Sequence, residues 1–191
     1  MFMYQRTVSD QPEITYKLTD YGIGTVIKPI KSTENPFNKN SFDELFELQR
    51  EDGSWTLTED LCTILGVRYD VCMEILVDAG IKSLAKRVQD ELKTLLATCI
   101  AILLIIELES PDMVPGHMQE NFWKRSLPKW LAESIEGGSQ EVDEDHFPPH
   151  EQMIKTVKYY YKKEIDCRWA SSILELGNSW GEVAAKMLGM V

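Results

Sequence analysis

One long stretch, residues 84–109, is apolar on nearly every side. Its apolar positions recur every three or four residues: Leu84, Val88, Leu92, Leu95, Cys99, Ile102, Leu103 and Ile106. The uncharged part, Thr94–Ile106, has 13 residues, whereas a helix needs ~20 to cross a bilayer. A helix that is apolar all round is stable only inside a ring of other helices. The sequence therefore predicts an all-α fold, a compact bundle of about six to eight helices around this long central helix.

The helical pattern starts near residue 41 and divides the chain into two parts. Residues 1–40 show no sustained period and are predicted to form a weakly ordered leader, with at most one strand or hairpin. Residues 41–191 are predicted to form one helical domain, which contains a helix at Asn121–Glu136 and an acidic linker at about 137–149.

Polar residues before apolar runs predict where individual helices begin. Ser41 and Ser179 each precede a glutamate by three residues, which is the spacing of a capping box. Thr58 and Asp70 are predicted to cap the two helices that start near them.

The segment from about His150 to Trp169 is predicted to be an amphipathic helix that docks on the core. Its apolar stripe is predicted to consist of Ile154, Val157, Tyr161 and Ile165. A second stripe consists of Lys155, Lys158 and Lys162. A solvated lysine face is the favoured interpretation of this second stripe, over contact with an acidic partner.

Two similar motifs place a tryptophan after a glycine turn. They are Asp52-Gly53-Ser54-Trp55 and Gly177-Asn178-Ser179-Trp180, and the segments that follow them end at Leu65-Gly66 and Leu188-Gly189. Glycine tolerates a positive φ, and a glycine after the last turn ends a helix. The pattern favours tryptophans that fill the core, and hot spots of a binding face are the alternative.

Charge and motif content argue against several classes of function. The net charge of −11 makes a nucleic acid an unfavourable partner because both would be negative. The chain lacks GxGxxG, GxxxxGK[ST], HExxH and GxSxG, so we expect no catalytic residues and no bound cofactor. Two prolines separate His146 from His150, so we expect no metal site either. The four cysteines fall in apolar helical patterns and are predicted to be buried free thiols.

Five separate segments match one known pattern in order and in nearly all spacings: Asp52–Trp55, Gly80–Leu84, Leu95–Thr98, Leu174–Trp180 and Leu188-Gly189. Together with Phe42, Leu45 and Leu48 they resemble the C-terminal domain of vault poly(ADP-ribose) polymerase, which is related to the C-termini of von Willebrand factor A domain-containing proteins. The resemblance covers about residues 36–191. The residues it marks as determinants of fold or interaction are Asp52, Gly53, Trp55, Gly80, Leu84, Leu176, Gly177, Asn178, Trp180, Leu188 and Gly189.

The resemblance implies an interaction module that binds the major vault protein, the shell subunit of the vault ribonucleoprotein particle. From the free thiols, the short uncharged run and the missing catalytic motifs we expect this module to be cytoplasmic and non-catalytic, without a membrane or a small-molecule substrate. Two alternatives stay open at this point. The same helical domain could bind a different protein, as in the von Willebrand factor A-type relatives, or the chain could be a fragment of an ADP-ribosyltransferase whose catalytic domain lies elsewhere.

Overall fold

The computed structural model describes residue 27 and residues 29–32, 36–109 and 150–190. Its helices, in chain order, are η1 (Lys39–Ser41), α1 (Phe42–Glu47), α2 (Glu59–Ile64), α3 (Tyr69–Asp78), η2 (Ile81–Ser83), α4 (Lys86–Glu109), α7 (His150–Ile173) and α8 (Trp180–Met187). The β structure within these described ranges is one isolated bridge, between Lys31 and Val67. The predicted all-α fold is therefore confirmed.

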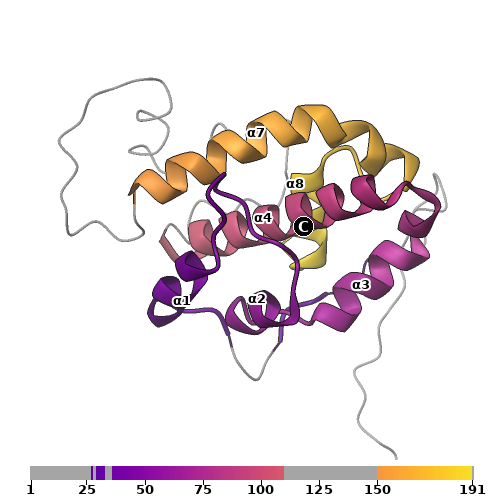
Figure 1. The fold of residues 1–191 in the computed structure, drawn as a ribbon. Helices are drawn as coiled ribbons and strands as arrows, with labels where there is room; N and C mark the ends of the chain where they lie inside the picture. Colours follow the sequence, from indigo (N-terminus) through magenta and orange to yellow (C-terminus); the bar gives the residue numbers. More distant parts are fainter. Residues whose placement is uncertain (1–26, 28, 33–35, 110–149, 191) are drawn as a thin grey trace, which may run out of the picture.

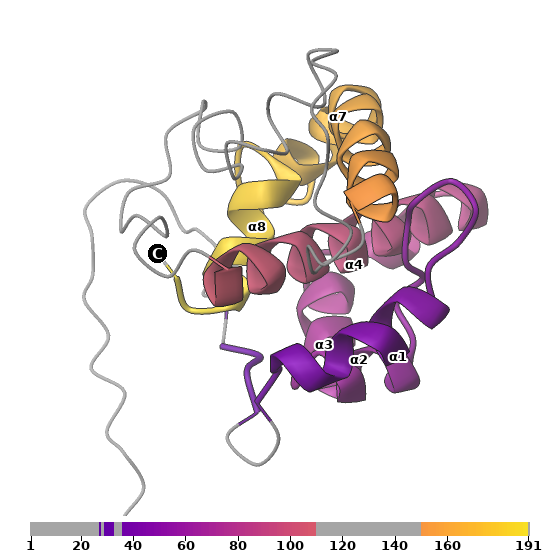
Figure 2. The same cartoon turned by 90° about the vertical axis from the view of Figure 1, so that its left-hand side faces the viewer.

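Helix α4 lies at the centre of the described structure. Figures 1 and 2 show α7 and α8 on one side of it and α1, α2 and α3 on the other. Every side chain from Thr94 to Ile106 is buried. The predicted central helix is thus confirmed, although it starts at Lys86, because Leu84 is extended (ψ 156°) after the turn η2.

The cap predictions have mixed outcomes. The hydroxyl of Thr58 accepts the N–H of Leu61 at 3.2 Å, as expected for an N-cap. The prediction of a capping box at Ser41 is wrong, because the Ser41 side chain makes no cap hydrogen bond. Turn η1 brings the chain into α1 already helical, with Ser41 at φ −85° and ψ −3°, whereas an N-cap needs an extended backbone. The side chain of Asn38 caps η1 instead, since it accepts the N–H of Asn40 at 2.9 Å.

Helix α3 also starts differently from the prediction. Arg68, and not Asp70, precedes its first residue, and Asp70 lies in the first helical turn. The N–H of Arg68 donates to the carbonyl of Ile30 at 2.8 Å, next to the Lys31–Val67 bridge, so the bridge sets where the helix begins. A carboxylate in the first turn still interacts favourably with the helix dipole.

Part of the predicted leader packs against the helices. Ile30 is fully buried, and its N–H donates to the carbonyl of Met187 at 2.8 Å, at the end of α8. Ser32 donates to the carbonyl of Gly66 at 2.7 Å, and the Phe37 ring meets the Phe42 ring edge to face at 5.5 Å between centroids. Residues 30–32 therefore join the end of α8 to the α2–α3 connection, and Phe37 packs on the start of α1.

Three sequence predictions lie outside the described residues: the order of residues 1–26, the helix at Asn121–Glu136 and the acidic linker at 137–149. The prediction for the cysteines is confirmed, since Cys62, Cys72, Cys99 and Cys167 are all buried and free.

Candidate interaction site

The first glycine–tryptophan motif fixes the α1–α2 connection to the central helix. Trp55 is fully buried. Its indole N–H donates to the carbonyl of Leu45 at 2.8 Å, and its backbone N–H donates to the hydroxyl of Thr98 on α4 at 3.2 Å. The ring also lies 5.7 Å from that of Phe46, centroid to centroid. Both N–H groups of this tryptophan have acceptors inside the core, which is what a large buried indole requires.

The second motif repeats the same arrangement on another pair of helices. Trp180 is fully buried. Its indole N–H donates to the carbonyl of Cys167 at 3.0 Å, and its backbone N–H donates to both carboxylate oxygens of Glu164 at 3.2 Å. In each motif an indole binds a helix carbonyl and the tryptophan backbone binds a side chain of a long helix. The long helix is α4 for Trp55 and α7 for Trp180.

Gly53 brings the first motif into direct contact with α7. Its φ is +86°, which an L side chain rarely adopts. A Cβ on this residue would overlap the backbone of Lys155 and would lie 2.6 Å from the backbone nitrogen of Thr156. The Gly53 carbonyl accepts the Thr156 hydroxyl at 2.9 Å, and Gln49 Nε2 donates to the same hydroxyl oxygen at 2.7 Å. Asp52 shapes the turn by accepting both the N–H and the hydroxyl of Ser54, at 3.1 and 2.6 Å.

The residues around Trp180 form the predicted cap of α8. The Ser179 hydroxyl accepts the Glu182 N–H at 3.1 Å, and the Glu182 carboxylate accepts the Asn178 N–H at 3.0 Å. Lys186 donates to the same carboxylate at 2.6 Å. Partial burial alone would raise the pKa of Glu182, but the hydrogen bonds from Lys186 and Asn178 outweigh it and lower the pKa. The cap is therefore an ionised, locally closed unit.

The other family-like positions serve as helix ends and core contacts. Gly80 follows α3 with φ +87°, and no neighbouring group lies within 4 Å of the position that a Cβ would occupy. Gly189 follows α8 with φ +68° and donates to the carbonyl of Lys186 at 3.0 Å. Leu176 and Leu188 are buried, and Leu84 packs partly buried against the core. Asp52, Asn178 and Gly189 are exposed, while Gly177 is half-buried.

Glu164 is a buried acid on the inner face of α7, with 4% of its surface exposed. Burial raises the pKa of its carboxyl, and the N–H of Trp180 and the Arg168 guanidinium offset only part of this rise. Arg168 Nε lies 3.8 Å from a Glu164 oxygen. The carboxylate thus accepts the first N–H of α8, which has no partner within the helix, at the end where a helix binds negative charge.

The predicted apolar stripe of α7 is wrong in part. Val157 is buried, but Ile165 is 75% exposed, and Ile154 and Tyr161 are only partly buried. The inner face is instead formed by Met153, Thr156, Val157, Tyr160, Glu164, Cys167, Ala170 and Ser171, and Leu174, directly after the helix, is buried too. Glu164 can lie on this buried face because its carboxylate accepts the backbone N–H of Trp180. Trp180 belongs to a later segment of the chain, so the pattern of α7 alone does not reveal this partner. Lys155, Lys158 and Lys162 are exposed, as predicted.

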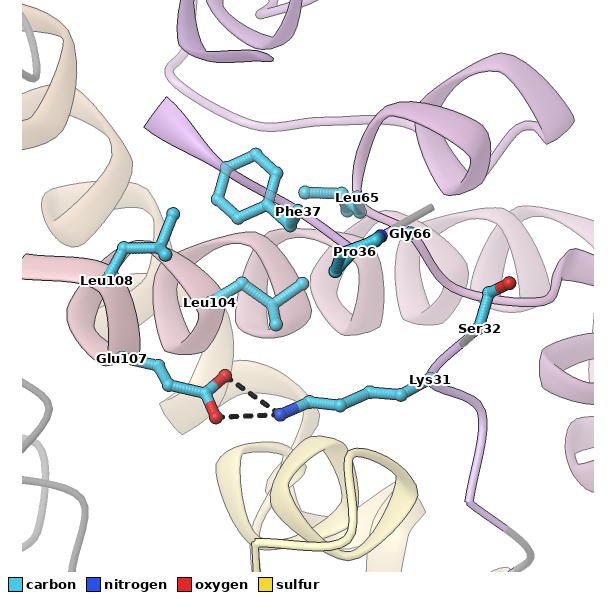
Figure 3. A pocket seen from close by; sticks show the side chains of 9 residues that line it. All are labelled: Lys31, Ser32, Pro36, Phe37, Leu65, Gly66, Leu104, Glu107 and Leu108. Carbon is cyan, nitrogen blue, oxygen red and sulfur yellow. Dashed lines mark hydrogen bonds and ion pairs between the residues drawn. The ribbon is translucent and has the colours of Figure 1, made fainter. Parts of the chain in front are cut away.

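One cavity opens between residues 31–32 and 36–37, the end of α2 and the last turns of α4. Its volume is about 320 Å³, and Phe37, Leu65, Leu104 and Leu108 form its apolar wall. Figure 3 shows Lys31 reaching across to Glu107, with Nζ 2.8 Å from both carboxylate oxygens. Because the two charges pair with each other, neither Lys31 nor Glu107 offers a free charge to a ligand in this cavity.

A second hollow, of about 530 Å³, lies between α4, α7 and the turn at Arg50–Asp52. Its wall is charged. Lys86 pairs with Asp90 at 2.7 Å and Arg87 pairs with Glu91 at 3.3 Å, each one helical turn apart along α4. Such pairs are typical of a solvated helix face.

Two features are absent from the described part of the chain. No group of three or more histidine, cysteine, aspartate or glutamate side chains is placed to hold a metal ion there. Within the same ranges, no helix combines the length and the apolar character needed to span a bilayer.

Comparison with known proteins identifies a family. The family model described as the PARP4 MVP-ID C-terminal domain matches residues 44–191. Protein mono-ADP-ribosyltransferase PARP4 of Mus musculus is 29% identical over 150 residues, which cover 76% of this chain and 7% of that protein. The Homo sapiens protein of the same name is 29% identical over 151 residues, covering 77% of this chain and 8% of the relative. The chain thus spans less than a tenth of these relatives, and no solved structure matches it.

Proposed function

This chain belongs to the family of the PARP4 MVP-ID C-terminal domain, and on that basis we propose that it docks on the major vault protein, the shell subunit of the vault ribonucleoprotein particle. The observation that carries the proposal is the match over residues 44–191, which include both glycine–tryptophan motifs. An acidic chain of net charge −11 is compatible with a protein partner and disfavours direct binding of the particle's RNA.

The architecture supports a role in presenting a surface. Buried hydrogen bonds from both motifs hold α7 against the core, through Gly53 and Thr156 at one point and through Trp180 and Glu164 at another. A surface that is ordered before binding loses less conformational entropy when a partner docks. We propose that the interaction unit is residues 41–191, with Ile30 and Phe37 completing its core.

The matched family is an interaction domain and not a catalytic one. The transferase name belongs to relatives of which this chain spans only 7–8%. We propose that no reaction takes place on this domain, and that vault association places it in the cytoplasm.

Direct binding tests this function. The purified 191-residue chain is immobilised, and purified major vault protein is passed over it in a biolayer interferometry experiment. We expect saturable binding, and the absence of binding would refute the assignment. Incubation with labelled NAD is the companion test, because transfer of label to any protein would overturn the non-catalytic part.

A partner other than the shell subunit would point to the alternative suggested by the von Willebrand factor A-type relatives. Mass spectrometry of proteins that co-purify with the chain from cell extract distinguishes the two outcomes. The shell subunit is expected among the proteins that the wild-type chain retains, and in a smaller amount with Trp180→Ala, which is expected to be destabilised.

A further inference from the structure

An apolar ridge runs along the outer face of α7. Among the described residues, the large apolar side chains with high exposure are Leu48, Ile165, Trp169 and Ile173. Three of these four lie on α7, at 75%, 47% and 65% exposed, and they are spaced one helical turn apart. Ile165 and Ile173 are eight residues apart in the helix, which separates them by about 12 Å along its axis.

This ridge faces away from the core. The opposite face of α7 packs on α4 and α8, and Figures 1 and 2 show no labelled helix on the outer side of α7. Single exposed apolar residues are common, whereas three large ones on successive turns of one helix face are typical of an interaction surface. Tryptophan is the side chain most enriched among residues that dominate binding energy.

Three lysines lie on the same face of α7 as the ridge, nearer the start of the helix. Lys162 precedes Ile165 by three residues, and Lys158 precedes it by seven, so all three lie on one side of the helix. Lys155 lies seven residues before Lys162 on that side, and all three lysines are exposed. Glu151 and Asp166, which are also exposed, lie one turn from Lys155 and Lys162, so the strip holds three basic and two acidic side chains. The chain as a whole has 20 basic and 31 acidic residues, so the net charge of this strip is opposite in sign to the net charge of the chain.

We propose that the outer face of α7 is the docking surface for an acidic amphipathic helix of the shell subunit. The inference rests on the function proposed above. The apolar residues of the partner helix pack on Ile165, Trp169 and Ile173, and its acidic residues pair with Lys155, Lys158 and Lys162. Ridges formed by residues four apart fit the grooves of a second helix, which favours a helical partner over an extended one.

The sign of the charges makes the interaction specific. The net charge of −11 repels an acidic helix from the chain as a whole, whereas the three lysines attract it, so charge favours this site and sets the orientation of the partner. The Gly53 and Trp180 motifs contribute indirectly, because they hold α7 in place with its ridge outward. In this proposal the two motifs are needed for binding because they fix the orientation of α7.

The test compares matched variants of the full 191-residue chain for binding to purified major vault protein. Ile165→Glu and Trp169→Glu each insert a charge into the ridge, and Leu48→Glu makes the same change at an exposed apolar residue outside the ridge, at the end of α1. We expect both ridge variants to weaken binding by about tenfold or more and Leu48→Glu to bind like wild type.

The lysines are tested separately. The double variant Lys158→Glu/Lys162→Glu is expected to weaken binding and to flatten its dependence on salt, because counter-charges across the interface are lost. Lys82→Glu, an exposed lysine on η2, is the control and is expected to change neither.

The outcomes separate the two proposals. Wild-type chain that does not bind at all refutes the proposed function. Wild-type binding that the ridge variants retain refutes only this surface. A dimer in sedimentation analysis that Trp169→Glu converts to a monomer would show a second copy on the ridge. A melting temperature that Trp169→Glu lowers by more than about 4 °C would show that the chain covers its own ridge. Either of these last results overturns the proposal.

Discussion

Replacing Gly53 by alanine tests the contact through which the first glycine–tryptophan motif holds α7. The chain provides its own control, because Gly80 has nearly the same φ, +87° against +86°, but no neighbouring group within 4 Å of its Cβ position. Alanine at Gly80 therefore reports only the strain of a left-handed backbone. Alanine at Gly53 reports the same strain plus the overlap with α7.

The expected magnitudes follow from these two geometries. A left-handed conformation costs an alanine about 1–2 kcal/mol, and a less flexible unfolded chain recovers about 0.4–1 kcal/mol of that. Gly80→Ala should therefore lower the free energy of unfolding by about 1 kcal/mol. At Gly53 the new Cβ would lie 2.6 Å from the Thr156 nitrogen, so α7 must move by about 1 Å to restore a normal contact of ~3.5 Å.

That displacement adds two costs at Gly53. Overpacking of this kind costs about 1–3 kcal/mol. The hydrogen bond from the Thr156 hydroxyl to the Gly53 carbonyl, 2.9 Å in the native fold, would stretch as well, and such a bond contributes about 0.5–1.5 kcal/mol. We expect Gly53→Ala to lower the free energy of unfolding by about 3–5 kcal/mol in total.

Urea denaturation followed by tryptophan fluorescence measures both variants under the same conditions. Two-state curves with unchanged slopes give the two losses by linear extrapolation. The reasoning fails if the Gly53→Ala loss lies within about 0.5 kcal/mol of the Gly80→Ala loss, the spread expected of unrelated surface changes.

Three further predictions concern the second motif. Trp180→Ala should lower the free energy of unfolding by about 3–5 kcal/mol in urea denaturation, and a normal unfolding curve would contradict the buried position of the ring. Ser179→Ala should cost about 1 kcal/mol by the same assay, through loss of the α8 cap, while Ser172→Ala on the exposed side of α7 should cost nothing measurable. Burial raises the pKa of the Glu164 carboxyl, so the folded chain binds that proton more tightly than the unfolded chain does. The resulting stability is complete below the ordinary pKa of 4.5 and declines as the pH rises through the higher folded value. Glu164→Gln removes this decline, so the free energy of unfolding of the variant, relative to wild type, should increase with pH above 4.5. Urea denaturation at a series of pH values measures this difference. Parallel pH profiles for the two proteins would contradict a raised pKa of Glu164 in the fold.

Features decided by neighbouring residues could be predicted from the sequence. The central helix follows from a spacing of apolar residues that repeats over many turns, and all 13 side chains from Thr94 to Ile106 are buried as expected. The caps at Thr58 and Ser179 involve atoms three residues apart, so their hydrogen bonds form as soon as the helix does. The resemblance to the vault polymerase domain likewise rests on residues that lie close together within each motif.

Features decided by distant segments required the tertiary structure. Helix α7 carries apolar residues on both faces, so its period alone does not say which face is buried. Glu164 points inward because it accepts the N–H of Trp180, 16 residues away, and Ile165 is consequently turned outward. Ile30 is buried because Met187 and Arg68 bond to its backbone, and nothing in the local pattern of residues 1–40 reveals such partners. Local spacing determines where helices form, whereas the side that each helix buries depends on which long-range partners satisfy its polar groups.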